Sequence, residues 1–235
     1  MPPQMTSAEY TQILLQGQEV WNRARQEHAA EPAPDLSGIQ FAHADLSGFD
    51  LHGVVLQKAY LRGATLRGAC LRDADLQSAY LMGADLDNAE LSRSRLVAVN
   101  FNGANLAGCT FDGADLRDAD CGGADLTSAD FTDADLHGAN LLGANIEGAV
   151  FTRTRGLSSR QLMAARNWEQ ARLHGDLAVQ LDLPPAGRDQ PCQGPSSPSV
   201  PEKRRAVAAG RRNRGSGETA NAFQVLECSP DPTLL

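Results

Sequence analysis

Residues 124–143 read ADLTS-ADFTD-ADLHG-ANLLG, and this five-residue pattern runs without a break from Pro34 to Arg153. The pattern has 24 units, whose central residues fall at every fifth position from Leu36 onward. The central residue is Leu, Phe or Ile in 23 of the 24 units, and Cys121 is the exception. Ala lies two residues before the centre in 17 units, Asp or Asn directly before it in 14, and Gly two residues after it in 13. This unbroken register determines the fold of the segment.

A period of five residues fits neither a straight α-helix nor a straight β-strand. In an α-helix, five residues rotate an apolar stripe by about 140°, so a long array would become apolar on every face. In a strand, an odd period sends successive central residues to opposite faces. Each unit must therefore contain its own bend, which Gly favours because it tolerates positive φ. Asp or Asn before the centre can bond the local backbone and hold that bend. The pattern predicts an all-β solenoid in which the central residue and the Ala both point inward.

The repeated unit A-D/N-L-x-x resembles that of the pentapeptide-repeat proteins, as in Ala124-Asp125-Leu126 and Ala134-Asp135-Leu136. The resemblance covers residues 34–153. It implies a right-handed quadrilateral β-helix with four units per coil, whereas the spacing alone leaves the number of sides open. The 24 units would then form about six coils, and at ~4.8 Å per coil the rod would be about 29 Å long.

Residues 1–33 are expected to form an N-terminal cap on this solenoid. Thr6 and Glu9 have the spacing of a capping box, and a single helix should follow to about His28. Repeat arrays need such caps because their ends expose apolar side chains and unpaired strand edges. The alternative is a helix that docks a partner.

Residues 154–185 are expected to form a second helical cap, and residues 186–235 a disordered tail. Ser158 and Gln161 again have capping-box spacing. Both flanks resemble the terminal helices of bacterial pentapeptide-repeat proteins, and a dimer-forming helix is the alternative for the second. The tail is rich in Pro, Gly, Ser and Arg, which is typical of disorder. Its basic run, Lys203–Arg214, is either an electrostatic arm or part of a solvated tail without a role.

Composition and motifs argue against several classes of function. The net charge of −8 disfavours direct binding of nucleic acid by the rod. No apolar run approaches 18 residues and no signal-peptide pattern opens the sequence, so we expect a cytoplasmic protein that makes no membrane contact. The five cysteines show no C-x-x-C or Cys/His spacing, and no phosphate-binding loop or nucleophile motif is present. We therefore predict no enzyme activity, no catalytic residue, no metal and no cofactor.

The outward residues distinguish the two halves of the array. Residues 34–103 hold six basic and eight acidic groups, a net charge of −2, whereas residues 104–153 hold two basic and nine acidic groups, a net charge of −7. If the section is four-sided, residues twenty apart stack, so Tyr60 would lie beside Tyr80. That pair is either part of a contact surface or a ladder that only stabilises the sheet. The candidate partner-binding residues are Asp115, Asp120, Asp125, Asp130, Asp135, Tyr60 and Tyr80.

Three functional hypotheses follow. The first is a non-catalytic scaffold that presents an outward face of the rod to an unknown protein partner. The second comes from the resemblance: family members that resemble B-form DNA in width and acidity bind type II topoisomerases, and the acidic residues 104–153 would suit such mimicry. The third is a structural or regulatory role without a fixed partner.

Overall fold

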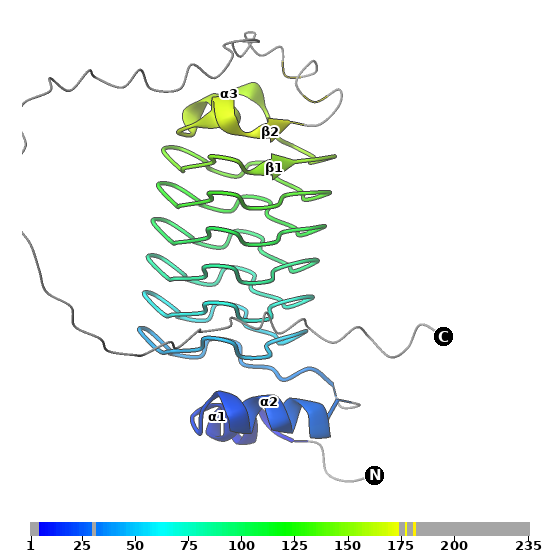
Figure 1. Cartoon of the computed structure of the whole chain (residues 1–235). Coiled ribbons are helices and arrows are strands. Elements are labelled where there is room, and N and C mark those ends of the chain that lie inside the picture. The colour runs from blue at the N-terminus through cyan, green and yellow to red at the C-terminus, as the bar shows by residue number, and fades with distance from the viewer. Residues whose placement is uncertain (1–4, 30–31, 174–176, 178–180, 182–235) are drawn as a thin grey trace, which may run out of the picture. The chain divides into compact units, whose positions relative to one another are not determined.

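Parallel β-bridges between residues twenty positions apart build the repeat segment (Figure 1). The computed structural model describes residues 5–29, 32–173, 177 and 181. The bridges begin at Asp35–Val55 and recur every five residues as far as Asp135–Arg155. Each turn of the chain therefore takes twenty residues and has four sides of five residues each, as the resemblance implies.

Each side of the rod consists of the five-residue units that carry one ladder of bridged residues. We number the sides in chain order, each by the ladder that it carries. The ladder of face 1 consists of every twentieth residue from 35 to 155. The ladders of faces 2, 3 and 4 likewise run from 40 to 140, from 45 to 145 and from 50 to 150. Two consecutive units of the sequence therefore lie on adjacent faces, and units twenty residues apart lie on the same face.

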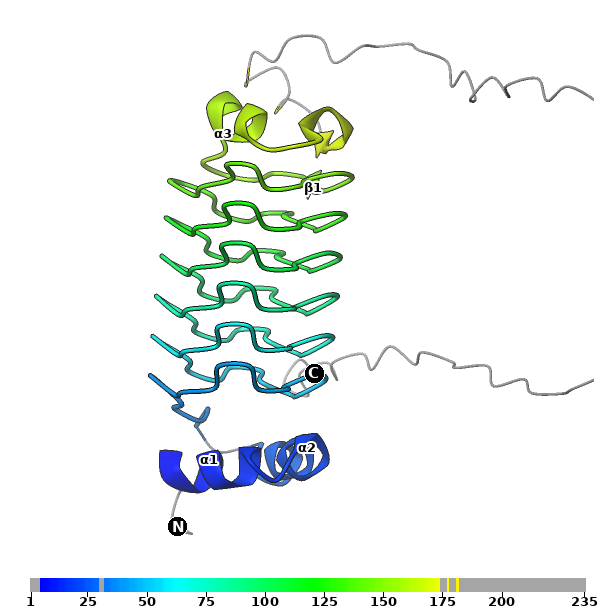
Figure 2. The ribbon, with the colours of Figure 1, turned by 90° about the vertical axis from the view of Figure 1, so that its left-hand side faces the viewer.

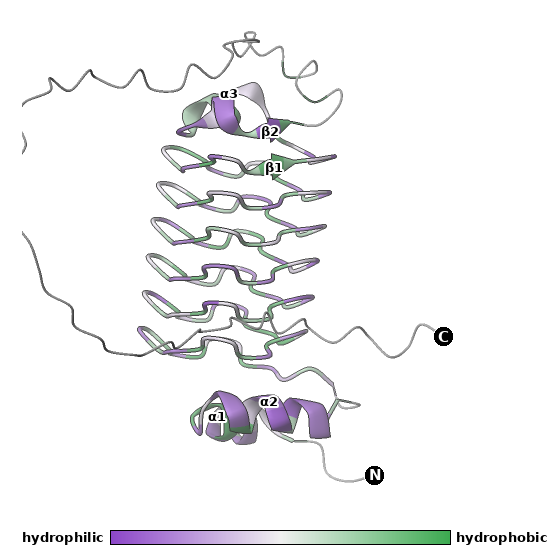
Figure 3. Ribbon diagram, in the orientation of Figure 1, coloured by the Kyte–Doolittle hydropathy of each residue, from purple (hydrophilic) through white to green (hydrophobic). Residues whose placement is uncertain are grey.

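The inside of the rod is filled by the residues that the pattern predicts to point inward. Every central residue from Leu46 to Phe151 is buried, and almost all the small residues two positions before them are buried as well. Phe111, Phe131 and Phe151 stack along the inside of face 4, with ring centroids 4.9 and 5.1 Å apart. Figure 3 shows hydrophobic and hydrophilic residues alternating along each coil.

Two local features hold the bends of the repeat units, and both were predicted. In all 14 units that have Asp or Asn before the centre, the side-chain Oδ1 accepts a hydrogen bond from the backbone N–H two residues further on. The residue two positions after the centre has positive φ in every unit, between 52° at Arg153 and 72° at Gly138. This requirement explains why Gly is the commonest residue there.

Two helices precede the rod where the sequence predicts one (Figure 2). Helix α1 (Ser7–Leu14) begins with the predicted capping box of Thr6 and Glu9, and helix α2 (Gln18–Glu27) follows it. The break lies at Gly17, whose φ of 99° is not helical. The ring of Trp21 on α2 packs edge-on against Tyr10 of α1, with centroids 6.1 Å apart.

Side chains of α2 bond backbone groups of the first coil that have no preceding coil to bond. Trp21 Nε1 donates to Asp50 O at 2.6 Å, and Asn22 Oδ1 accepts from Asp50 N at 2.8 Å. One coil later, at the equivalent residue Cys70, the backbone O accepts from Leu51 N and the backbone N donates to Phe49 O, both in the coil before it. Helix α2 thus supplies the hydrogen bonds that a preceding coil would supply.

The other end of the rod finishes in an irregular turn. Arg155 still bridges Asp135 on face 1 and Arg166 bridges Asn145 on face 3. Between Arg155 and Arg166 the chain forms helix α3 (Ser159–Ala164) in place of a unit on face 2.

Helix α3 begins with the predicted capping box of Ser158 and Gln161. The Nε2 of Gln161 also donates to Leu136 O at 3.0 Å and Ala139 O at 2.9 Å. Leu136 O already accepts the turn bond from Ala139 N, so Ala139 O is the carbonyl for which this side chain replaces a following coil. The helix is shorter than predicted because Ala165, with φ −83° and ψ 159°, is extended and ends it after Ala164. A 3₁₀ turn, η1 (Trp168–Gln170), follows.

The last regular pairing joins strand β1 (Val150–Phe151) to strand β2 (Arg172–Leu173) in parallel. None of the described helices has the length and hydrophobicity that a membrane span requires. The predicted tail, residues 186–235, lies outside the described residues.

The substitution Leu86→Asp tests the inward assignment. Leu86 is 0% exposed, so an unpaired carboxylate there should lower the free energy of unfolding by roughly 3–5 kcal/mol. Gln77→Ala, at a half-buried outward position, is the control and should change it by less than about 0.5 kcal/mol. Chemical denaturation followed by circular dichroism measures both, and equal effects would contradict the assignment.

A pair of substitutions at Asp130 separates the turn bond from the charge. Asp130 Oδ1 accepts from the backbone N of Thr132 at 2.9 Å. Asp130→Asn keeps this acceptor and should leave the free energy of unfolding within about 0.5 kcal/mol of wild type, whereas Asp130→Ala removes it and should cost about 1 kcal/mol. If the Asn variant were as unstable as the Ala variant, the charge and not the turn bond would be the stabilising feature.

Candidate partner-binding surface

The described residues contain no arrangement that indicates catalysis. No group of three or more His, Cys, Asp or Glu side chains among them could hold a metal ion. The thiols of Cys109 and Cys121 are buried in the core, and burial raises the pKa of each to about 12. A thiol with so high a pKa is not a nucleophile at neutral pH.

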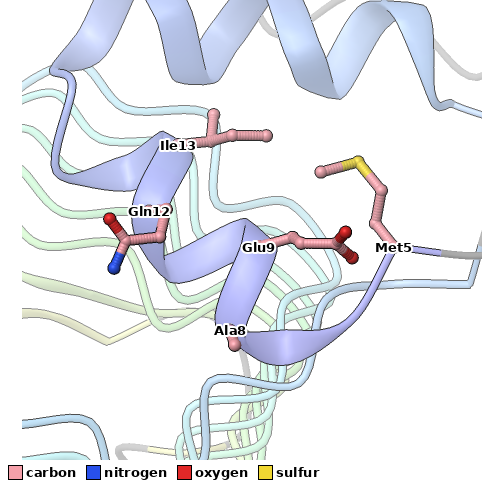
Figure 4. Close-up of a pocket in the computed structure, with 5 residues that line it drawn as sticks. All are labelled: Met5, Ala8, Glu9, Gln12 and Ile13. Atoms are coloured by element: carbon pink, nitrogen blue, oxygen red, sulfur yellow. The ribbon is translucent and has the colours of Figure 1, made fainter.

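A shallow hollow lies on helix α1 and the residues just before it (Figure 4), with a volume of about 400 Å³. It is lined by Met5, Ala8, Glu9, Gln12 and Ile13. The one ionisable group of this lining is Glu9, whose carboxylate accepts a bond from Thr6 N at 2.7 Å as part of the capping box. The capping role explains this carboxylate, so the hollow offers no acid–base group of its own.

The predicted aspartates do not form one surface. Because consecutive units occupy adjacent faces, Asp115 and Asp135 lie on face 1, Asp120 on face 2, Asp125 on face 3 and Asp130 on face 4. Of these five, Asp115 and Asp135 are bridged neighbours. The acidic half of the rod therefore spreads its charge around the whole section.

The same aspartates are occupied by local interactions. Each accepts the turn bond described above, and Asp115 also receives two hydrogen bonds from the guanidinium of Arg117, at 2.8 and 2.7 Å. The hydrogen bonds from Arg117 hold the pKa of Asp115 below its usual range, against the opposing effect of burial. Burial alone would raise the pKa of Asp135, but hydrogen bonds from the ring and backbone of His137 lower it below the usual value. Turn formation explains these residues before any partner is invoked.

The two tyrosines lie together as predicted. Tyr60 and Tyr80 are bridged neighbours on face 2, and their rings stack with centroids 4.7 Å apart and planes 18° apart. Asp120 is on the same face, two coils beyond Tyr80. Face 2 is thus the side of the rod that holds both tyrosines and one of the predicted aspartates.

Face 2 differs from the other faces in charge. Between residues 34 and 153, face 1 carries eight Asp, Glu, Lys or Arg residues, face 3 carries six and face 4 carries nine. Face 2 carries two, Arg62 and Asp120. Its other ladder positions are Tyr or the uncharged amides Gln40, Asn100 and Asn140.

Face 2 also carries the exposed apolar side chains of the rod. The described residues include six exposed large hydrophobic side chains, of which Leu15 and Met163 belong to the segments outside the repeat. The other four all lie on face 2, with these exposed fractions: Tyr60 45%, Tyr80 42%, Met82 39% and Leu142 66%. Sequence reasoning missed Met82 and Leu142. Sorting the outward residues by their position in a twenty-residue turn would have found them.

Comparison with known protein families gives one match, to the model described as "Pentapeptide repeats", in eight copies. The matched residues are 35–73, 59–96, 74–113, 94–133 and 114–153. Together they span 119 of the 235 residues, slightly more than half of the chain. A search of curated proteins finds no match.

Solved structures similar to this chain are also pentapeptide-repeat proteins. Rfr23 from the cyanobacterium Cyanothece 51142 is 22% identical, with 57% of this chain and 96% of that chain covered and a TM-score of 0.45. HetL from Nostoc sp. strain PCC 7120, involved in heterocyst differentiation regulation, is 23% identical, with 64% and 92% covered and a TM-score of 0.29. QnrB1, a plasmid-mediated fluoroquinolone resistance protein, is 21% identical in a trypsin-treated form, with 63% and 86% covered and a TM-score of 0.28.

Pentapeptide-repeat proteins fold as right-handed quadrilateral β-helices. The four-sided turn of twenty residues, the inward Leu and Ala positions and the family match all agree with that fold. This chain belongs to the pentapeptide-repeat family.

Proposed function

We propose that this protein is a non-catalytic interaction scaffold that presents face 2 of its rod to a protein partner. One observation carries the proposal: face 2 has two charged residues, whereas each other face has at least six, and it holds all four exposed large hydrophobic side chains of the rod. The buried centres of protein interfaces are depleted in charged residues and enriched in Tyr and Met. Covering face 2 would therefore remove apolar area from water and leave few charges without solvent.

The backbone of the rod favours binding because it fixes the positions of these side chains in advance. The backbones of Tyr60 and Tyr80 are bridged to each other, about 4.8 Å apart along the rod. Their rings already stack in the free protein, so a partner would not have to order them. A preorganised surface of this kind gains affinity from a small number of contacts.

The terminal segments fit the scaffold role as caps. In the proposed arrangement, α1 and α2 close one end of a rod of six coils and α3 closes the other. The hydrogen bonds that Trp21, Asn22 and Gln161 form with backbone groups lacking a neighbouring coil support this role. A capped end is protected from pairing with the strand edges of another chain, which leaves the sides of the rod for recognition.

A DNA-mimicking inhibitor or protector of a type II topoisomerase is the second candidate function. It is favoured by the net charge of −7 over residues 104–153, from two basic and nine acidic groups. The distribution of these acids over four faces and the pairing of Asp115 and Asp133 with arginines weaken the field on any one side.

Cytoplasmic location, bacterial origin and a role without a fixed partner stay predictions.

Affinity capture from a lysate of the source cells tests the proposal with the full chain. We expect wild type to retain a partner protein. A variant with Tyr80→Ala and Met82→Ala on face 2 should retain at least about tenfold less of it, because the central apolar anchors of an interface carry most of its binding energy. The matched control places Gln77→Ala and Val97→Ala on face 1, and it should retain the protein.

A third variant tests the acidic half without disturbing the turns. Asp115→Asn, Asp125→Asn and Asp135→Asn remove three charges and keep the turn acceptor that Asn provides elsewhere in the array, as at Asn105. If this variant alone fails to retain a topoisomerase subunit, charge mimicry by the acidic half replaces the proposal that face 2 binds the partner. If no variant changes what is retained, the role without a fixed partner gains support.

A further inference from the structure

We infer that face 2 also binds a second copy of this chain, in a weak dimer whose two rods lie side by side and parallel. The inference rests on the proposed function, since it names a second copy as a partner of the same face. Face 2 carries two outward rows. Row one is the bridged ladder, residues 40, 60, 80, 100, 120 and 140. Row two lies two positions further on, at residues 42, 62, 82, 102, 122 and 142, which are exposed except for the buried Gly122.

The geometry of a two-fold axis along the rods determines which residues meet. Rotation by 180° about an axis that lies between the faces and runs parallel to the rods keeps the height of each coil and reverses the direction across the face. Each coil therefore faces the same coil of the second copy, and row one of one copy faces row two of the other. No choice of offset along the rod is involved.

The residues opposed in this way are chemically complementary. Tyr60 faces Arg62 of the second copy, which allows a cation–π contact. Tyr80 faces Met82 of the second copy, and a thioether beside an aromatic ring is favourable. In the next coil, the side-chain amide of Asn100 faces that of Asn102 of the second copy, and the two can exchange hydrogen bonds. Symmetry makes each contact twice.

The coils that hold Asp120 and Asn140 introduce no repulsion. In the coil of Asp120, row two holds Gly122, which is buried and has no side chain, so Asp120 meets no charged group of the second copy. Asn140 faces the exposed Leu142 of the second copy. No like charges meet anywhere on face 2, because its charged residues, Arg62 and Asp120, lie in different coils.

The other faces do not suit the same arrangement. On face 3, Asp85 in row one would meet Asp87 of the second copy in row two, which gathers four carboxylates around the two Arg67 side chains that already bridge them. Face 4 would enclose nine charged residues. On face 1, Arg117 is already paired with Asp115 of its own chain. Face 2 is the side on which self-association costs least in desolvated charge.

The size of face 2 sets the expected strength of the dimer. From residue 40 to residue 140 the ladder makes five steps of ~4.8 Å, about 24 Å, and five extended residues span at most about 17 Å across. The resulting contact of about 400 Å² per copy is half of the ~800 Å² per partner typical of stable complexes. We therefore expect a reversible dimer with a dissociation constant between about 1 µM and 1 mM.

Analytical ultracentrifugation of the full chain across this concentration range tests the inference. Wild type should pass from monomer to dimer. Met82→Glu should weaken the dimer at least about tenfold, because it buries an unpaired charge against Tyr80 of the second copy. Gln77→Glu is the matched control, since it makes the same charge change in row two of face 1 and should dimerise like wild type. Thermal unfolding verifies that both variants are folded.

Either of two results would overturn the inference: a wild type that stays monomeric throughout the range, or equal dimerisation of the two Glu variants. If wild type is monomeric but the face 2 variant still loses a lysate protein, self-association fails while the proposed function stands. If the chain dimerises through face 2 and no lysate protein depends on that face, the opposite holds.

Disulfide crosslinking tests the parallel orientation, with Asn100→Cys in one preparation and Asn102→Cys in another. Parallel rods place residue 100 of one copy opposite residue 102 of the other, so a mixture of the two variants should crosslink more than either alone. Wild type measures the background from the native cysteines. Antiparallel rods centred on this coil would instead crosslink each variant to itself, and that result would reject the parallel arrangement.

Discussion

Backbone hydrogen bonds between neighbouring coils impose the geometry on which the rest of this rod depends. Asp85 N donates to Ala64 O of the coil before it at 2.9 Å, and Leu86 N donates to Asn105 O of the coil after it at 2.8 Å. Bonds of this kind recur around the four sides, so each residue is held over its counterpart one turn earlier. Packing then follows from the ladder, because the inward residues of successive coils are brought into contact as stacks, such as the phenylalanines of face 4.

This constraint changes how the acidity of the chain should be understood. An aspartate before the central residue is first a turn residue, since its Oδ1 bonds the backbone two residues on, and Asn performs the same task at Asn100 and Asn105. A high Asp content therefore arises from the folding of the repeat and is weak support for an anionic binding surface. The absence of charge is more informative, because face 2 keeps the fold while substituting Tyr or an amide at most of these positions.

Much of the fold could be predicted from the sequence because one rule repeats 24 times. The inward residues, the turn bonds and both capping boxes follow from local chemistry and are confirmed. The ends were harder, since a single residue decides each of them: Gly17 divides the first helix, and the extended backbone of Ala165 ends the second early. The candidate surface could be predicted only in part. Residues five apart in sequence look like neighbours, yet they lie on adjacent sides, so Asp115 to Asp130 are spread around the section while Tyr60 and Tyr80 meet.

The turn of twenty residues also governs how such a protein can change length. Inserting or removing twenty residues adds or deletes one whole layer, and every side keeps its alignment from end to end. Inserting five residues between Met82 and Leu142 would instead rotate everything that follows by a quarter turn, and Leu142 would move to the next side. Growth by whole layers thus preserves a recognition surface and lengthens it, whereas growth by single repeats dismantles the surface and leaves the core intact.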